Sequence, residues 1–225
     1  MKRTLLWALL FLGISTPILA IDCTSEEVIS IENQRESLKA LQLARLKNGQ
    51  KNREGRYEFA PTPEAEQKQR SELDKSMKTC ADAGHILATY IAGEDARIIG
   101  EQQESAFASF SNFLSRNPDP SLAVQNAQLK RAAEDSYREA VRWFEKSSAV
   151  GYIPAMFELA KLHRDGKGVP KSAFLAIEWF DRAGRGSLAN GSREAAARSL
   201  EEMTKISSSH PLTVRLTQEI YPAVR

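Results

Sequence analysis

One phrase of this sequence occurs twice, and that doubling constrains the fold more than any other feature. The first copy reads Ala-Val-Arg-Trp-Phe-Glu-Lys-Ser-Ser and the second reads Ala-Ile-Glu-Trp-Phe-Asp-Arg-Ala-Gly, with an offset of 36 residues. Trp143 therefore corresponds to Trp179, and Phe144 to Phe180. A period in this range is typical of helical repeats, in which each helix pair buries its apolar face against the next. The doubling predicts an all-α protein that binds rather than catalyses.

The first twenty residues have the layout of a secretory signal peptide. Lys2 and Arg3 form a basic head, residues 5–14 are apolar, and Ala20 places a small residue before a cleavage point. The apolar run is too short to span a bilayer as a helix. We therefore expect residues 1–20 to be removed and the mature protein to lie in the periplasm or, alternatively, to be secreted. A retained amphipathic anchor is the other interpretation, and no stable membrane insertion is expected after cleavage.

The charge of the remaining chain argues against a nucleic-acid partner. The sequence has 31 Lys and Arg and 29 Asp and Glu, and residues 1–20 contribute two basic and no acidic residues. The mature chain is formally neutral, so no global electrostatic attraction to nucleic acid or anionic lipid is expected. Basic residues do concentrate between 45 and 56, but Glu54 and Glu58 interrupt them. A solvated helix end and loop is the preferred interpretation of that run.

The sequence contains two cysteines, Cys23 and Cys80. An even pair in an exported chain predicts a disulfide. The alternative is a reactive thiol at Cys80 assisted by His85, but the sequence places no third orienting residue nearby.

Capping and stop signals divide the chain into helices with almost no strand. We expect helices at 25–47, 62–83, 121–150, 153–164, 171–183, 192–205 and 212–221, with a polar loop at 47–61. Ser121 is expected to cap the long helix at 121–150. Residues 84–100 are apolar and helical, but Gly93 and Gly100 are expected to weaken that segment.

An aromatic stripe at Phe107, Phe110 and Phe113 lies at helical spacing before Asn117. Rings three residues apart share one helix face, and that face is usually core. The stripe also falls within a candidate insertion, so the alternative is a protruding element that binds a partner. The core interpretation is preferred because exposed aromatic patches reduce solubility.

The segment 139–184 resembles the Sel-one-like repeats of the tetratricopeptide-like superfamily. The residues that carry the resemblance are Ala140, Trp143, Phe144, Gly151, Ala155, Leu159, Gly166, Gly168, Ala176, Trp179, Phe180 and Ala183. The resemblance implies a short right-handed α-solenoid of helix–turn–helix units. Gly166 and Gly168 have the conformational freedom that a tight turn needs, and Pro170 is expected to start the following helix.

The expected organisation has four parts. Residues 1–20 are the signal peptide, and residues 21–83 form an N-terminal helical cap tethered by the disulfide. Residues 84–206 form the repeat region, best matched at 139–184 and with a candidate insertion at 100–120. Residues 207–225 form a C-terminal capping helix.

Strings that suggest catalysis lack the context that catalysis requires. His163-Arg-Asp begins like a kinase loop, but Pro170 occupies the position of the metal-binding asparagine. Gly166-Lys-Gly lacks the frame of a phosphate loop. His85, His163 and His210 lie on separate predicted elements without metal-ligand spacing. No catalytic residue, metal or cofactor is expected, and an unrecognised cell-envelope hydrolase is the remaining enzymatic alternative.

The function predicted from these observations is protein–protein recognition. Stacked helix pairs create extended surfaces for a protein partner, whose identity and contact residues the sequence does not specify. A periplasmic adaptor or regulator of an envelope or secretion complex is the general prediction. The resemblance also implies a sharper alternative, an immunity protein, because exported members of the family include some that neutralise lipase toxins delivered between bacteria.

Overall fold

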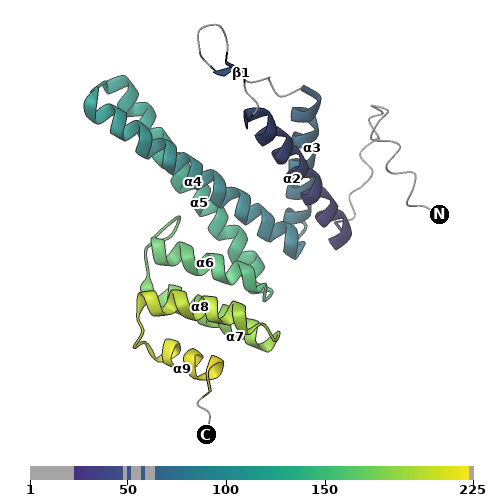
Figure 1. Cartoon of the computed structure of the whole chain (residues 1–225), viewed down its shortest axis with the longest axis vertical. Coiled ribbons are helices and arrows are strands. Elements are labelled where there is room, and N and C mark those ends of the chain that lie inside the picture. Colours follow the sequence, from purple (N-terminus) through teal and green to yellow (C-terminus); the bar gives the residue numbers. More distant parts are fainter. Residues whose placement is uncertain (1–22, 48–49, 52–56, 59–63, 223–225) are drawn as a thin grey trace, which may run out of the picture. The chain divides into compact units, whose positions relative to one another are not determined.

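The computed structural model describes residues 23–47, 50–51, 57–58 and 64–222 (Figure 1). The predicted signal peptide lies outside these residues. The chain forms two compact units, residues 1–76 and 77–225, and each is described by itself. The described secondary structure is almost entirely helical, as the sequence predicts.

The N-terminal unit is built on helix α2 (Ser25–Lys47) and most of α3 (Glu64–Asp82). Between them, β1 (Gln50–Lys51) and β2 (Tyr57–Glu58) pair antiparallel where a loop was predicted, because this polar stretch forms a short hairpin. Arg35, only 7% exposed, donates hydrogen bonds to Asp74 at 2.8 Å and to Glu32 at 2.6 Å. A buried guanidinium with two carboxylates ties α3 to α2.

Cys23 and Cys80 are both disulfide-bonded, and they are the only two cysteines in the sequence. The predicted disulfide is therefore present, and the Cys80 sulfur is no free thiol. Cys80 is fully buried in the last turn of α3.

Helices α4 to α9 form the C-terminal unit and stack in chain order (Figure 1). Each of the helices α5 to α9 packs on the helix before it, and α9 also packs on α7. This arrangement is the α-solenoid that the sequence predicts. The helices are α4 (Ile86–Arg116), α5 (Pro120–Ala149), α6 (Ile153–Asp165), α7 (Ala173–Ala189), α8 (Arg193–Ile206) and α9 (Pro211–Ile220).

Two hydrophobic cores hold the stack together. The first lies between α4, α5 and α6 and has Phe144 and Leu159 at its centre, both fully buried. The second joins α6, α7, α8 and α9 around Phe180 and Met203, which are also fully buried. The half-buried ring of Trp179 packs against both cores. The repeat is therefore joined to its neighbours through the residues of the doubled phrase.

The expectation that Gly93 and Gly100 weaken residues 84–100 is wrong, because both lie inside the uninterrupted helix α4. A Cβ on Gly93 would come within 2.6 Å of the Phe144 ring. One on Gly100 would come within 2.9 Å of the Tyr137 ring. Because these glycines have no side chain, aromatic rings of α5 can pack directly against the α4 backbone. This close helix contact offsets the low helix propensity of glycine.

Helices α4 and α5 form an antiparallel hairpin with coiled-coil spacing. Buried or half-buried positions alternate by three and four residues on both helices, the pattern of a heptad seam. They are 89, 93, 96, 100, 103, 107, 110 and 114 on α4, and 122, 126, 129, 133, 136, 140, 143 and 147 on α5. The outer half of the hairpin, around residues 101–130, extends beyond the stack of α6 to α9 (Figure 1). The candidate insertion at 100–120 is thus the end of α4 and the turn that follows.

Three predicted helix boundaries are wrong. Asp119 rather than Ser121 caps α5, because its carboxylate accepts from the backbone amides of Ser121 and Leu122 at 2.8 and 3.3 Å. Helix α7 begins after the capping residue Ser172 and not at Pro170, and it continues past Ala183. The continuation follows from packing, because Ala183 and Gly184 are buried beneath α8 and α9.

Candidate docking groove

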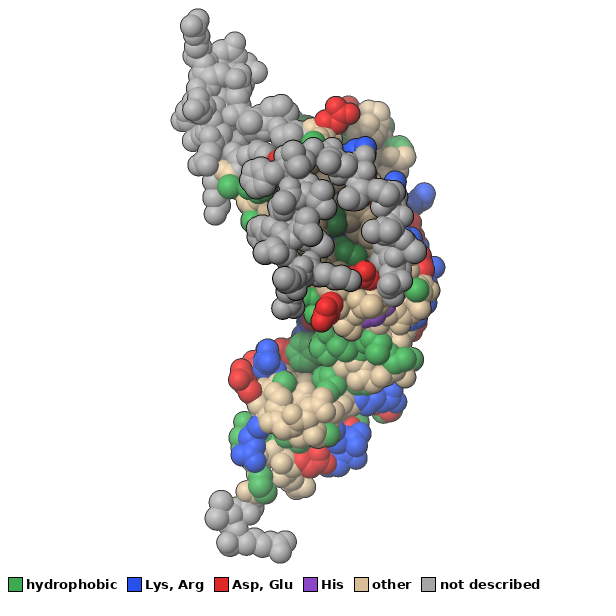
Figure 2. Space-filling model, turned by 90° about the vertical axis from the view of Figure 1, so that its right-hand side faces the viewer, with side chains coloured by type: hydrophobic (Ala, Val, Ile, Leu, Met, Phe, Trp, Pro, Cys, Tyr) green, Lys and Arg blue, Asp and Glu red, His purple; other side chains and the backbone are tan. Residues whose placement is uncertain are grey.

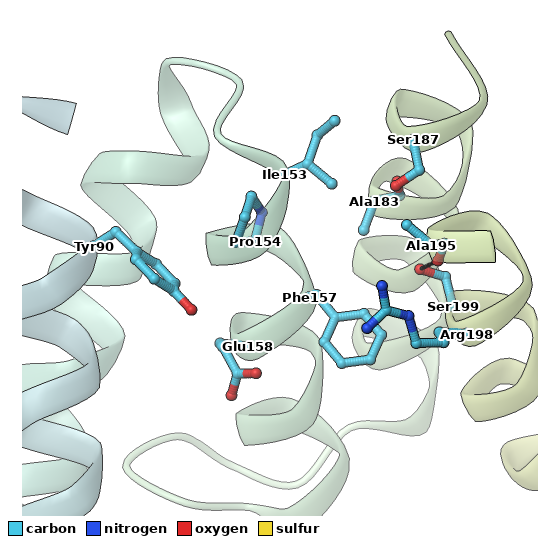
Figure 3. A pocket seen from close by; sticks show the side chains of 10 residues that line it. All are labelled: Tyr90, Ile153, Pro154, Phe157, Glu158, Ala183, Ser187, Ala195, Arg198 and Ser199. Atoms are coloured by element: carbon cyan, nitrogen blue, oxygen red, sulfur yellow. Dashed lines mark hydrogen bonds between the residues drawn. The ribbon is translucent and has the colours of Figure 1, made fainter. Parts of the chain in front are cut away.

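A groove of about 230 Å³ runs between α4, α6, α7 and α8 (Figure 3). It is lined by Tyr90, Ile153, Pro154, Phe157, Glu158, Ala183, Ser187, Ala195, Arg198 and Ser199.

The floor of the groove is apolar. The ring of Phe157 meets the buried ring of Phe180 edge to face, with centroids 5.1 Å apart. Ile153 packs closely on α7, since a Cβ on Gly186 would lie 3.1 Å from two of its side-chain atoms. Apolar surface also surrounds the start of helix α6, where Val150 is 62% exposed. Figure 2 shows hydrophobic side chains gathered in a band at the height of α6.

Tyr90 places a hydroxyl at the α4 side of the groove (Figure 3). Its ring packs against Tyr152 and Phe144, with centroid distances of 5.1 and 5.8 Å. Burial, with help from the carboxylates of Glu94 and Glu158, raises the pKa of the Tyr90 phenol well above its usual range. The hydroxyl thus stays protonated, and it donates no hydrogen bond to any residue that the structure describes.

A charged network fixes Glu158 beside this hydroxyl. Arg97 donates to both carboxylate oxygens of Glu94 at 2.8 and 3.1 Å, and its Nε lies 3.6 Å from Glu158 Oε2. Lys161 donates to Glu158 at 2.8 Å. The hydrogen bonds to Glu94, opposed by burial, raise the pKa of the Arg97 guanidinium. These contacts hold the Glu158 side chain in a fixed position and link α6 to α4.

Arg198 lies on the other side of the groove, on α8. It is exposed and makes no hydrogen bond or ion pair with any residue in the described part of the chain. The two serines that line the groove donate to carbonyls of their own helices, Ser187 to Ala183 and Ser199 to Ala195. The groove therefore offers an unpaired cation on one side and a neutral hydroxyl donor on the other.

Of the repeat residues singled out in the sequence, Ala183 lines the groove, and the others lie in the turns and cores of the stacked helices. Gly151, Gly166 and Gly168 all have positive φ angles, of 87°, 73° and 71°. Trp143 is 7% exposed, with the ammonium of Lys146 lying 4.2 Å from its ring centroid. The other repeat residues are fully or almost fully buried, apart from Trp179: Ala140, Phe144, Ala155, Leu159, Ala176, Phe180 and Ala183.

The histidines do not assemble a reaction site. His85 and His210 cap helices, because their Nδ1 atoms accept from the backbone amides of Ala88 and Leu212, each at 3.3 Å. His163 is half-buried in α6, and burial lowers the pKa of its imidazole. Among the described residues, no group of three or more His, Cys, Asp or Glu could hold a metal ion.

Comparison with known families identifies the middle of this unit. A Sel1 repeat model matches residues 132–152 and 153–187. These two segments are Sel1 repeats. The first covers the second half of α5, and the Sel1 repeat at 153–187 covers α6 and most of α7. Sel1 repeats are typical of protein-interaction scaffolds, and the groove runs along the second of them.

Similarity outside the Sel1 repeats is limited. The chain is similar to the crystal structure of a Sel1 repeat protein from Oxalobacter formigenes, at 17% identity over 88% of this chain and 95% of that chain, with a TM-score of 0.26. None of the curated proteins matches the chain in sequence. No helix in the described ranges is long and apolar enough to cross a membrane.

The polar residues of the groove were missed by the sequence analysis. Tyr90 belonged to a segment recognised only as apolar and helical, and Arg198 is one arginine among many. The heptad spacing of α4 would have placed Tyr90 beside the seam of the hairpin, next to Thr89. Nothing in the sequence indicates that Arg198 faces Glu158 across Phe157.

Proposed function

We propose that the Sel1 repeats of this protein bind a protein partner through the groove between α4, α6, α7 and α8. The observation that carries the proposal is an apolar floor beside two polar groups, the Tyr90 hydroxyl and the Arg198 guanidinium, neither of which has a hydrogen-bond partner among the described residues. Interfaces are commonly centred on aromatic anchors and arginines of this kind.

The size of the groove favours a protein partner over a small-molecule substrate. Its volume of about 230 Å³ lies below the roughly 300–1,000 Å³ of typical small-molecule sites. It suits one or two side chains of a larger partner that rests on the surrounding helices. The absence of a nucleophile–base pair among the lining residues points the same way, because acyl or glycosyl transfer needs such groups in reach of each other.

The polar groups define the chemistry of the partner. An apolar side chain would occupy the floor against Phe157, and a neighbouring carboxylate of the partner would pair with Arg198. Tyr90 would donate a hydrogen bond to a carbonyl oxygen. Glu158 would disfavour a second acidic group on the α4 side, so the partner could bind in one orientation only, with its acidic group toward Arg198.

We further propose that the protein works in the periplasm. The support is the basic and apolar pattern of residues 1–20 together with the use of both cysteines in a disulfide. A partner in an envelope or secretion complex would make the protein an adaptor or regulator. A lipase-type toxin as partner would make it an immunity protein, a role that rests on compartment and on the resemblance to exported family members.

The test is affinity capture from the envelope fraction, followed by calorimetry with the purified partner. We expect Arg198→Glu to weaken binding by at least tenfold, since it replaces the unpaired cation by an anion. Arg193→Glu is the matched control, because Arg193 is an equally exposed arginine on the same helix outside the groove. Equal affinity of the wild type and both variants would contradict the proposal.

A further inference from the structure

The outer half of the α4–α5 hairpin is poor in charge. Residues 105–129 include only two charged residues, Arg116 and Asp119, in a chain that is 27% charged overall. The rest of this segment is built mainly from Ala, Ser, Phe, Leu, Asn and Gln. Depletion of charge combined with aromatic enrichment is the compositional signature of an interface core, and a solvated helix end is normally rich in charge.

One flank of this hairpin already has a partner within the unit. Tyr137 donates to Glu104 at 2.7 Å, and Lys167, from the turn between α6 and α7, donates to the same carboxylate at 2.7 Å. Glu104 and Tyr137 lie on the same side of the heptad seam. That side therefore faces the Sel1 repeats.

The opposite flank carries an apolar stripe. Ile99, Ala106 and Phe113 recur at intervals of seven residues and share one side of α4. Ile99 is 47% exposed and Phe113 is 49% exposed, while Ala106 is also exposed. The Phe113 ring stacks on that of Phe110, with centroids 6.1 Å apart, so the stripe is continuous with the seam.

The seam beneath the stripe is incomplete as a two-helix structure. Asn126 occupies a seam position and is 7% exposed. Its Nδ2 donates to Ser111 at 2.7 Å, but its Oδ1 is buried without a donor. A polar side chain at a seam position lowers the stability of a two-helix tip, and burial of the apolar flank against further helices can offset that loss.

We propose that this stripe is a self-association surface, on which the hairpins of two copies of the chain pack as a four-helix bundle. Charge selects a second copy as the occupant. The charge-poor tip at residues 105–129 carries only Arg116 and Asp119, which have opposite signs, so two copies meet without like-charge repulsion. A two-fold axis can also bring Arg116 of one copy toward Asp119 of the other, because an isologous contact pairs each residue reciprocally.

The two-helix form of the tip also fits this occupant. Two helices from each copy complete the layout of an antiparallel four-helix bundle, which buries all four apolar seams.

Sedimentation equilibrium of the purified protein over a wide range of micromolar concentrations tests the proposal. We expect a dimer for the wild type and loss of the dimer for Phe113→Glu. Ala106→Glu provides a second variant on the same stripe, at an exposed position where a folding defect is not expected. Val150→Glu, at a 62% exposed position outside the hairpin stripe, is the matched control that keeps the dimer. Circular dichroism of each variant verifies that the helices remain.

Three results would overturn the proposal: a monomeric wild type, a dimer that survives both stripe variants, or a dimer that Val150→Glu also abolishes. Binding of a monomeric wild type to vesicles of anionic and zwitterionic phospholipid, lost in Phe113→Glu, would assign the stripe to a membrane surface instead. The groove variant Arg198→Glu is expected to remain dimeric. The proposal for the stripe and the proposal for the groove are therefore tested independently.

Discussion

Gly168 lies directly against the backbone of Tyr137. A Cβ placed on Gly168 would come within 2.4 Å of the Tyr137 carbonyl carbon and 2.5 Å of its oxygen, and the residue has a φ of 71°. The turn between α6 and α7 thus rests on α5, in contact with the preceding Sel1 repeat. Because the obstruction is backbone, it cannot move aside as a flexible side chain could.

Gly168→Ala is therefore expected to destabilise the protein by about 2–5 kcal/mol, the sum of left-handed backbone strain and steric overlap. Gly191→Ala is the control, because Gly191 has a similar φ of 76° but open space around it. That variant should cost only about 1–2 kcal/mol. Urea unfolding of both variants measures the difference, and equal losses would show that the contact with Tyr137 contributes nothing.

Gly93→Ala tests the entry of the Phe144 ring into α4. Alanine improves helix propensity by about 1 kcal/mol, but its Cβ would meet the ring at 2.6 Å, and overpacking costs about 1–3 kcal/mol. We expect a net loss of up to about 2 kcal/mol in the free energy of unfolding. Gly186→Ala meets only the flexible end of Ile153, at 3.1 Å, and should be close to neutral. A gain in stability for Gly93→Ala would contradict the packing described for the hairpin.

The tryptophans of the doubled phrase differ in burial, so their replacement should differ in cost. Trp143 is 7% exposed, and Trp143→Ala is expected to lose about 3–5 kcal/mol. Trp179 is half-buried, and Trp179→Ala should lose less. Phe174→Ala, at a 59% exposed aromatic residue, is the control with little expected change. Thermal melting of the three variants gives the order, and an unchanged melt for Trp143→Ala would refute its place in the core.

Helix periodicity made much of this fold predictable, because the chain follows local rules over long stretches. Helix α2 begins at Ser25 and ends at Lys47, as its acidic first turn and leucine spacing indicate, but Thr24 rather than Ser25 caps it, because the Thr24 hydroxyl accepts from the Glu27 amide at 3.3 Å. The doubled phrase led to the correct repeat because its aromatic residues fill the cores. Where the prediction failed, at Gly93 and Gly100, tertiary contact with aromatic rings outweighed local propensity. The groove could not be predicted, because residues as distant as Tyr90 and Arg198 converge only when the helices stack.

The cluster of Glu104, Tyr137 and Lys167 should make stability depend on pH. Hydrogen bonds from Lys167 and then Tyr137 lower the pKa of the Glu104 carboxyl from its usual 4.5. Its stabilising effect is fully present above about pH 4.5 and is lost as the pH falls through the lower, folded-state value. Burial opposes the charge on Lys167, but hydrogen bonds to Glu104 and Tyr137 raise its pKa from 10.5 to about 12. That contribution is complete below pH 10.5 and is lost as the pH rises through about 12.

Glu104→Gln should therefore flatten the acid limb of the stability curve, as measured by urea unfolding at a series of pH values. Glu134→Gln is the control, because the Glu134 carboxylate makes no hydrogen bond or ion pair within the described residues. If the acid limb of the stability curve has the same slope in the wild type, Glu104→Gln and Glu134→Gln, the cluster does not stabilise the folded state.

Hydrogen–deuterium exchange of the protein with and without its captured partner tests the central claim most directly. The account predicts partner-dependent protection at residues 153–158 of α6 and 195–199 of α8, with protection lost in Arg198→Glu and kept in Arg193→Glu. Protection confined to α5 or α9, with α6 and α8 unchanged, would contradict the assignment of the groove as the binding site.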